Sequence, residues 1–294
     1  FADGVLRTVD RTTFTAGAAA GAIQSCVDDM FKWVNMQLNE GAYEGKRLFS
    51  QAQSREMWTP HIFIPISPRT PEELASLRPN FQAYALGWMT YDYRGERIVY
   101  HTGGLNGMVT RVTLVPSKKL GVIVLTNQQE GGAFQAVTTT ILNHYLGAPE
   151  KDWVAAYGAV RKRQEAEARE SVKKAAAARD ANSKPSLALA KYTGRFRDPW
   201  YGDVFVEEKN GKLWMRFSHT PALTGAIEHF QYDTFIARWN DRSQDADAYV
   251  TYSLNPDGSI AHVKMKAVSS TTDFSYDFHD LDLRPAPKDA PAYD

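Results

Sequence analysis

A charged, alanine-rich segment over residues 150–184 divides this 294-residue chain into two parts with different hydrophobic patterns. Before the segment, helical periodicity gives way to alternating strands. After it, apolar residues alternate with a period of two over 185–284. We therefore predict a first domain at 1–149, a connector helix at 150–184, a small antiparallel β-barrel at 185–284 and a tail at 285–294.

The first domain is expected to begin with helices and continue as antiparallel strands. Apolar side chains recur at helical spacing from Val27 to Leu38, with Ser25 as the expected N-cap and Gly41 at the end. The pattern then predicts a helix at 50–57, an irregular loop at 60–80, hairpins at 84–100 and 109–127, and a closing helix at 133–145. No helical crossover separates these strands, so the predicted fold class is α+β, with helices on a partial antiparallel sheet.

The second domain is predicted to be a barrel or sandwich of about eight short strands, the last of them at 274–278. Asn210-Gly211 predicts a type I′ hairpin turn, and Pro256-Asp257-Gly258 predicts another tight turn. Several aromatic residues either pack in the barrel core, which we favour, or line a ligand cavity: Trp200, Tyr201, Trp214, Trp239 and Tyr249.

The composition argues against several function classes. The 34 Lys and Arg residues balance 34 Asp and Glu residues, and no basic stripe predicts binding to nucleic acid or to an anionic membrane. The apolar runs are far shorter than the ~20 residues needed to span a bilayer. Cys26 is the one cysteine, so an internal disulfide is excluded and a structural role is expected. Because the chain starts at Phe1 rather than Met, we expect it to begin inside a longer product.

The run His101-Thr102-Gly103-Gly104 is the main candidate for chemistry. It is expected at the end of a strand, where glycines let a ligand approach the backbone and a free edge offers N–H donors. The imidazole and the hydroxyl add side-chain hydrogen-bonding groups. On these grounds alone a β-bulge remains the alternative.

With the following Leu105-Asn106-Gly107, this run resembles the Lys-Thr-Gly segment of serine β-lactamases and penicillin-binding proteins. The nearest form is the His-x-Gly of class C β-lactamases, related esterases and D-aminopeptidases. Flanking segments at 18–38, 84–88 and 112–127 resemble the same family, so the likeness extends over roughly residues 1–148. The last domain resembles the lipocalin-like barrel that often follows these hydrolases.

The resemblance implies roles for five residues along one wall of the site. Gly104 would donate a backbone N–H to the oxyanion hole, and Thr102 would bind a substrate carboxylate or carbonyl. His101 replaces the usual lysine as a catalytic residue, and Gly103 and Asn106 would contact substrate. An imidazole is mostly neutral at pH 7 unless perturbed, so we expect esters, amides or D-amino-acid peptides to be preferred over anionic β-lactams.

The nucleophile expected of this family is missing. Ser171-Val-Lys-Lys174 and Ser253-Leu-Asn255 match its Ser-x-x-Lys and Ser-x-Asn elements by spacing, but they lie in the connector and beside a barrel turn, and we interpret both as chance. We expect the nucleophile to come from a segment before Phe1 or from a second chain, and this chain alone to be inactive. No cofactor or metal is expected, because no metal-binding or nucleotide-binding motif occurs and five histidines show no ligand spacing: His144, His219, His229, His262 and His279.

The sequence therefore predicts part of a penicillin-binding-protein-like serine hydrolase that cleaves ester or amide bonds through an acyl-serine intermediate. The alternative is a non-catalytic ligand-binding or interaction module built on the barrel. The expected partners are a small-molecule or peptide substrate, the missing hydrolase segment and a second copy of the chain paired through a free sheet edge. A periplasmic or secreted location is implied by the resemblance alone.

Overall fold

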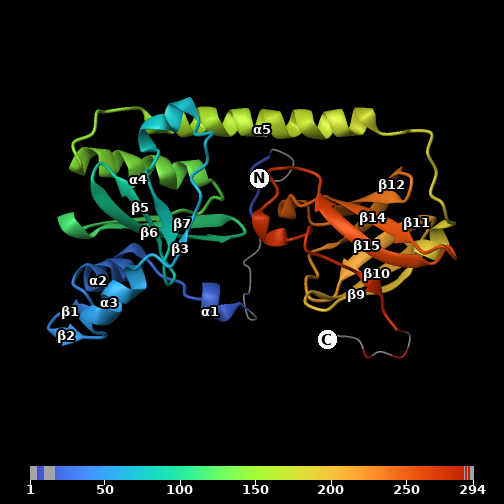
Figure 1. Cartoon of the computed structure of the whole chain (residues 1–294), viewed down its shortest axis with the longest axis horizontal. Coiled ribbons are helices and arrows are strands. Elements are labelled where there is room, and N and C mark those ends of the chain that lie inside the picture. The colour runs from blue at the N-terminus through green and yellow to red at the C-terminus, as the bar shows by residue number, and fades with distance from the viewer. Residues whose placement is uncertain (1–4, 10–16, 288, 290, 292–294) are drawn as a thin grey trace. The chain divides into compact units, whose positions relative to one another are not determined.

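The computed structural model describes residues 5–9, 17–287, 289 and 291. It divides the chain into two compact units, one of Thr8–Arg163 and one of Phe1–Arg7 with Gln164–Asp294 (Figure 1). The division falls inside the long helix α5 (Trp153–Ala178). None of the described helices has an apolar stretch long enough to cross a membrane.

A six-stranded antiparallel sheet organises the N-terminal unit (Figure 1). Each strand pairs with its sequence neighbour, as the predicted hairpins require, so the α+β class is confirmed. In spatial order the strands are β3 (Ile62–Phe63), β4 (Gln82–Tyr84), β5 (Met89–Tyr93), β6 (Glu96–Leu105), β7 (Met108–Val115) and β8 (Leu120–Leu125).

Helices pack on both faces of this sheet. On one face, α2 (Val27–Leu38) and α3 (Gln51–Trp58) contribute Val34, Leu38 and Trp58 to a cluster with Val99 of β6. On the other face, Leu142 of α4 (Gly131–Tyr145) packs against Ile98. Ile98 and Val99 are adjacent in β6 and both fully buried, as expected of a strand between two apolar layers. Smaller elements are α1 (Ala18–Gly21) and the hairpin of β1 (Ala42–Tyr43) and β2 (Lys46–Arg47).

Three local expectations for this unit are wrong. Cys26, not Ser25, precedes α2, and no side chain caps the helix because the Ser25 hydroxyl donates to the Cys26 carbonyl instead. The segment 60–80 is not wholly irregular, since it contains β3 and a 3-10 helix (Glu72–Leu77). The strand expected over 84–93 is interrupted by a turn in which the Ala85 N–H donates to the Trp88 carbonyl at 2.7 Å.

The first part of α5 belongs to the core of the N-terminal unit. Trp153 and Ala156 are buried against Ala136 of α4, so this part of the predicted connector helix packs in the core of the N-terminal unit. The later part is charged and exposed, and it carries two i,i+4 ion pairs, with N–O distances of 3.8 Å for Arg169–Glu165 and 3.9 Å for Lys174–Glu170.

The C-terminal unit is an eight-stranded antiparallel sheet that curls into a nearly closed barrel. A bridge between Val263 and Leu283 brings the two ends of the sheet together. A continuous cluster of buried side chains fills the interior. In chain order the strands are β9 (Gly194–Asp198), β10 (Gly202–Lys209), β11 (Lys212–Phe217), β12 (Thr224–Gln231), β13 (Thr234–Trp239), β14 (Ala248–Leu254), β15 (Ile260–Ala267) and β16 (Arg284–Pro285).

The end of the barrel differs from the expectation. Residues 274–276 form a 3-10 helix rather than the last strand, and the final strand is β16, which runs from Arg284 at the predicted end of the barrel into the predicted tail at Pro285. Pro285 has no N–H to donate to a ladder, and it lies opposite Phe196 of β9 on the short strand at the end of the sheet order, where a proline is tolerated. The expected type I′ turn is confirmed, with φ of +55° at Asn210 and +74° at Gly211.

The aromatic residues of the barrel have different roles. Trp239 is core, 1% exposed, and its indole N–H donates to the Ala246 carbonyl at 2.6 Å. Trp200 is 85% exposed and therefore does not pack in the core.

Candidate active site

The whole run His101–Gly104 lies inside β6, whereas the sequence suggested a strand that ends at Thr102 with Gly103 and Gly104 after it. The reason is the next strand: β7 pairs with β6 through to Leu105, opposite Met108, and so extends the strand past the glycines. On its other side β6 pairs with β5 only as far as Tyr100, which lies opposite Met89. Among the described residues, the five positions from His101 to Leu105 therefore have a paired edge and an open edge.

The open edge carries the backbone groups of alternate residues. In an antiparallel pair, opposite residues alternate between those that exchange hydrogen bonds and those that do not. Val109, opposite Gly104, bonds Thr126 instead: its N–H donates to the Thr126 hydroxyl at 3.3 Å, and its carbonyl accepts from the Thr126 N–H at 3.1 Å. Gly104 and, two residues earlier, Thr102 consequently direct their N–H groups to the open edge, whereas His101 and Gly103 bond β7.

The two glycines differ in what surrounds them. A Cβ at Gly103 would lie 2.7 Å from the Thr110 hydroxyl oxygen, whereas a Cβ at Gly104 would meet only a methyl of Val109 at 3.9 Å. Gly107 has φ +86° in the turn that connects β6 to β7, next to the half-buried Asn106. Close packing against β7 therefore explains Gly103, while Gly104 leaves the open edge unobstructed.

The His101 side chain is held by a partner at each ring nitrogen. Its Nδ1 is 2.6 Å from the Thr102 carbonyl oxygen, and its Nε2 is 3.5 Å from the Tyr84 hydroxyl oxygen. Tyr84 ends β4, so the contact spans the position where β5 has ended. Sequence reasoning placed Tyr84 only in a neighbouring strand, and nothing in the sequence indicated this contact.

Arg111 lies under this wall, opposite Thr102 on β7, and is only 4% exposed. Its guanidinium donates to Thr113 Oγ1 at 2.9 Å and to Gln135 Oε1 at 2.8 Å, and it lies 4.0 Å from the centre of the Tyr100 ring. No carboxylate of the described residues forms an ion pair with it. Burial raises the pKa of Tyr100 although the Arg111 charge acts in the opposite direction. The sequence signal for this group was a single arginine inside an apolar strand.

The two serines that match family spacing lie in other surroundings. Ser171 and Lys174 are exposed on α5, and Lys174 pairs with Glu170. Ser253 belongs to β14, and Asn255 begins a turn in which its N–H donates to the Ser259 carbonyl at 2.8 Å. Both serines belong to the C-terminal unit, whereas His101 belongs to the N-terminal one.

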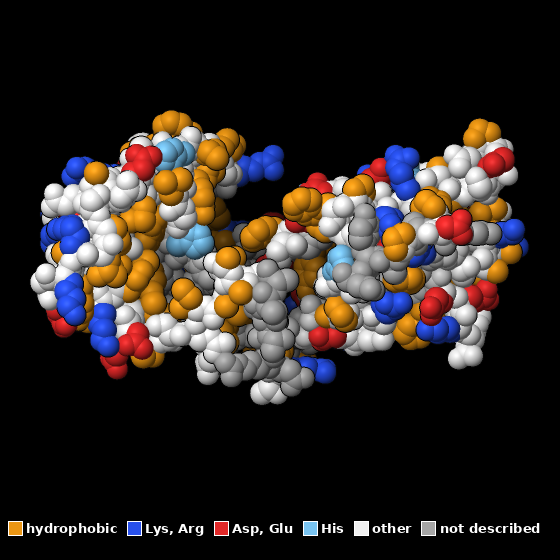
Figure 2. All heavy atoms as spheres, turned by 90° about the horizontal axis from the view of Figure 1, so that it is seen from below, with side chains coloured by type: hydrophobic (Ala, Val, Ile, Leu, Met, Phe, Trp, Pro, Cys, Tyr) orange, Lys and Arg blue, Asp and Glu red, His pale blue; other side chains and the backbone are white. Residues whose placement is uncertain are grey.

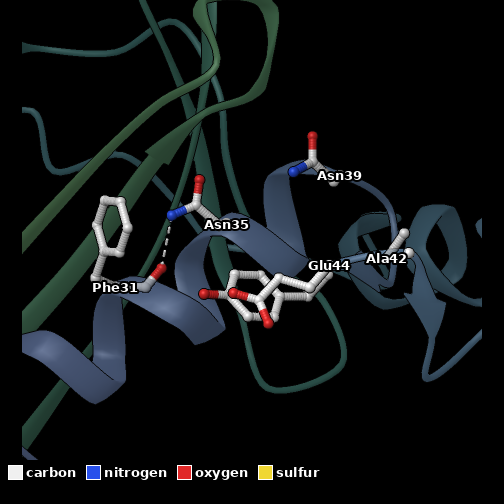
Figure 3. Close-up of a pocket in the computed structure, with 7 residues that line it drawn as sticks. Phe31, Asn35, Asn39, Ala42 and Glu44 are labelled. Atoms are coloured by element: carbon white, nitrogen blue, oxygen red, sulfur yellow. Dashed lines mark hydrogen bonds between the residues drawn. The ribbon is translucent and has the colours of Figure 1, made fainter.

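A hollow of about 420 Å³ lies between α2 and the β1–β2 hairpin (Figure 3). Asn35 and Asn39 approach it from the helix and Glu44 from the hairpin, and the Asn35 amide donates to the Phe31 carbonyl at 2.9 Å. Its lining includes no residue of the His101–Gly104 run. Figure 2 shows hydrophobic side chains, in orange, on the surface of this molecule seen from below. Exposed apolar residues of the N-terminal unit include Val27, Phe31, Ile62 and Phe63.

One group of possible metal ligands occurs among the described residues. Asp277, His279 and Asp280 bring their ligand atoms within 4.8 Å of one another on a surface turn of the C-terminal unit. His279 was expected to have no ligand partners, and the acidic residues that join it are close neighbours in sequence. Such solvated acidic turns are common without an ion, and Asp277 already accepts a hydrogen bond from the Tyr201 hydroxyl at 3.4 Å.

Two family profiles match the chain. Residues 2–146 match the family described as Beta-lactamase. Residues 178–285 match a family described as a domain of unknown function, DUF3471. The first match covers the sheet with its helices, and the second covers the barrel.

The chain is also similar to two curated fungal proteins. It is 28% identical over 241 residues to an unguisins hydrolase of Aspergillus violaceofuscus, covering 75% of this chain and 41% of that protein. It is 27% identical to an unguisins hydrolase of Aspergillus campestris, covering 84% of this chain and 46% of that protein. The chain therefore spans less than half the length of these relatives.

Among solved structures, the octameric penicillin-binding protein homologue from Pyrococcus abyssi aligns with a TM-score of 0.35 at 19% identity, over 83% of this chain and 45% of that one. A structure of SurE aligns with a TM-score of 0.28 at 14% identity, over 80% of this chain and 42% of that one.

Proposed function

Because residues 2–146 belong to the β-lactamase family, we propose that they form one wall of a serine-hydrolase active site that cleaves ester or amide bonds. The observation that carries the proposal is the open edge of β6, where the N–H groups of Thr102 and Gly104 have no partner strand among the described residues. Outward N–H donors of this kind bind carbonyl oxygens and stabilise charge that develops on them during reaction.

In this proposal Gly104 supplies one donor of the oxyanion hole. The second donor is the backbone N–H of the nucleophilic serine. Two such donors act on the oxygen only as it becomes negative, and removal of one typically costs about 3 kcal/mol of transition-state stabilisation. Gly104 suits the role because no side chain stands between its N–H and an approaching carbonyl.

The reaction proceeds in two balanced steps. The serine oxygen attacks the carbonyl carbon, the bond to the leaving amine or alcohol breaks, and the serine proton is transferred to that leaving group. Water then attacks the acyl-serine ester, which releases the acid and returns a proton to the serine. Thr102 and Gly104 bind and orient the acyl group through both steps.

For substrate class, we propose neutral esters or amides, including D-amino-acid peptides, ahead of anionic β-lactams. His101 stands where the family has a lysine, and the imidazole is already engaged with Thr102 and Tyr84. It therefore offers no counterpart to a lysine's mobile point charge for a substrate carboxylate. The two curated relatives are named as unguisins hydrolases, and these names support hydrolysis but not a particular substrate class for this chain.

We further propose that the nucleophile lies outside these 294 residues. Ser171 has an exposed, ion-paired lysine beside it rather than a desolvated one, and a solvated ammonium paired with a carboxylate is a poor general base for a serine hydroxyl. The test is incubation of the 294-residue chain with a covalent active-site serine probe, followed by mass spectrometry. We expect no labelling, and stoichiometric labelling of Ser171 or Ser253 would overturn this part of the proposal.

A second test addresses the oxyanion donor in the longest gene product that contains this chain. Gly104→Pro removes an N–H that makes no ladder bond, so we expect a loss of about 10²–10³ in kcat with the fold retained. Thr110→Ala, on the neighbouring strand, is the control and should change kcat little. Unchanged kcat in Gly104→Pro would contradict the assigned role.

The alternative of a ligand-binding module gains no support from the barrel, because packed side chains fill its interior.

A further inference from the structure

The contact between Tyr84 and His101 indicates a role for Tyr84, a residue that lies outside the His101–Gly104 run. We propose that Tyr84 is a positioning residue that holds His101 in one tautomer and one orientation, with Nδ1 protonated and Nε2 as the acceptor. The two residues come from β4 and β6 and meet where β5 has ended.

The tautomer follows from the chemistry of the two partners. The Thr102 carbonyl can only accept, so the imidazole nitrogen 2.6 Å from it must carry the proton. A neutral imidazole then has its lone pair on Nε2. The Tyr84 hydroxyl, 3.5 Å from Nε2, is a donor in the right place for that lone pair. The rings meet at 63° with centroids 6.3 Å apart, so the tyrosine also restricts rotation of the imidazole.

The arrangement has a consequence for the open edge. His101 occupies the Thr102 carbonyl, which would otherwise be an acceptor beside the Thr102 and Gly104 N–H donors. The edge thus offers the Thr102 and Gly104 N–H groups as donors and the Gly104 carbonyl as a backbone acceptor, since neither backbone group of Gly104 bonds Val109. The Nε2 that Tyr84 orients adds a side-chain acceptor beside them. The 3.5 Å separation is long for a hydrogen bond, so a substrate N–H or O–H can compete for Nε2. We therefore infer that Tyr84 and His101 together select substrates with a hydrogen-bond donor beside the scissile carbonyl, such as a peptide N–H.

Histidine nitrogen NMR on the 294-residue chain tests the tautomer without any catalytic activity. With 15N-labelled histidine, about 1.5 pH units above the ordinary histidine pKa, His101 should show a protonated Nδ1 and an unprotonated Nε2. His229 is an internal reference of the opposite type, because its Nε2 lies 2.9 Å from the Tyr232 carbonyl and must carry the proton. A protonated Nε2 at His101 would overturn the proposal, and this result needs no variant.

Tyr84→Phe tests the positioning role. The His101 Nε2 signal should move, and the Nε2–H form that free imidazole prefers should gain population. Tyr91→Phe is the matched control: Tyr91 contacts the Tyr100 ring on the adjacent strand and should leave the His101 signals in place. Identical His101 signals in the parent and Tyr84→Phe would overturn the proposal.

The catalytic consequence rests on the proposed function and is tested separately in the longest gene product that contains this chain. Tyr84→Phe should lower kcat/KM for an amide substrate by about tenfold to a hundredfold, and should have no further effect in a His101→Asn background. Equal losses in both backgrounds would show that Tyr84 acts structurally. If the NMR result holds and no hydrolysis is found in any protein, the proposed function fails while the tautomer assignment stands.

Discussion

Val109 gives both of its backbone hydrogen-bonding groups to Thr126, and Gly104 opposite it is thereby left with an N–H that faces away from β7. Hydrogen-bonded and non-hydrogen-bonded pairs alternate along an antiparallel ladder. The Gly104–Val109 pair therefore determines which residues of β6 bond β7 and which do not. It decides which backbone groups of the His101–Gly104 run are available to a ligand.

The different surroundings of the two glycines predict different tolerance to a side chain. Gly104→Ala should change the free energy of unfolding by less than about 0.5 kcal/mol, since its Cβ would meet only ordinary van der Waals contact. Gly103→Ala should cost about 1–3 kcal/mol because the new Cβ overlaps the Thr110 hydroxyl. Urea unfolding measures both, and Gly103→Ala with Thr110→Ala should recover most of the loss. Equal costs for the two single variants would contradict the account.

Removing the Gln135 amide, which accepts a hydrogen bond from the buried Arg111 guanidinium, should lower the free energy of unfolding. Gln135→Leu leaves a buried guanidinium with one fewer acceptor and should destabilise the chain by about 1–3 kcal/mol. Replacing the charge as well, in Arg111→Met with Gln135→Leu, should be less destabilising than Gln135→Leu alone. Chemical denaturation of the three proteins checks this, and additive losses would argue against a coupled pair.

The pair of Glu73 and Arg163 predicts a pH dependence of stability. Hydrogen bonds from the Arg163 guanidinium, at 2.7 and 2.9 Å, lower the pKa of Glu73 to about 2. Because the folded-state pKa lies below the unfolded one, the stabilisation is present above the ordinary glutamate pKa of about 4.3 and is lost as the pH falls towards 2. Glu73→Gln should therefore be less stable than the parent at pH 7, and the difference should shrink between those two pH values. A difference that stays constant down to pH 2 would contradict the assignment.

Close packing in the barrel predicts that Gly225 cannot be replaced by a residue with a side chain without loss of stability. A Cβ at Gly225 would overlap the Arg238 carbonyl oxygen, which is backbone and cannot rotate away. Gly225→Ala should cost about 3 kcal/mol or more, at the upper end for overpacking. Gly158→Ala is the control because nothing lies within 4 Å of its Cβ position, and it should be neutral or stabilising. Thermal unfolding of both variants distinguishes the cases.

Much of the fold was predictable because the spacing of apolar residues along a helix or strand indicates which face of that element is buried. The alternation in the strands and the helical spacing from Val27 to Leu38 gave the α+β class and the barrel correctly. The ends of elements were not predictable where a distant partner decides them. Gly103 and Gly104 looked like the end of a strand by composition, and pairing with β7 keeps them inside it. Pro285 was assigned to the tail and Arg284 to the last residue of the barrel, and pairing with β9 joins them in one strand.

The candidate site was predictable only in part. The residue types of the His101–Gly104 run identified the wall, since the motif is local in sequence. The direction of each N–H depends on which residues of β7 lie opposite, and the Tyr84 contact joins residues 17 positions apart. Neither follows from the spacing of residues along the chain.

Amide hydrogen exchange along β6 tests the central claim most directly. In the 294-residue chain, the N–H groups of Thr102 and Gly104 should exchange rapidly, while those of His101 and Gly103, bonded to β7, should be protected by at least about tenfold more. The measurement needs no substrate and no nucleophile. Protection of Gly104 equal to that of Gly103, or the reverse alternation, would contradict an open edge with Gly104 as its donor.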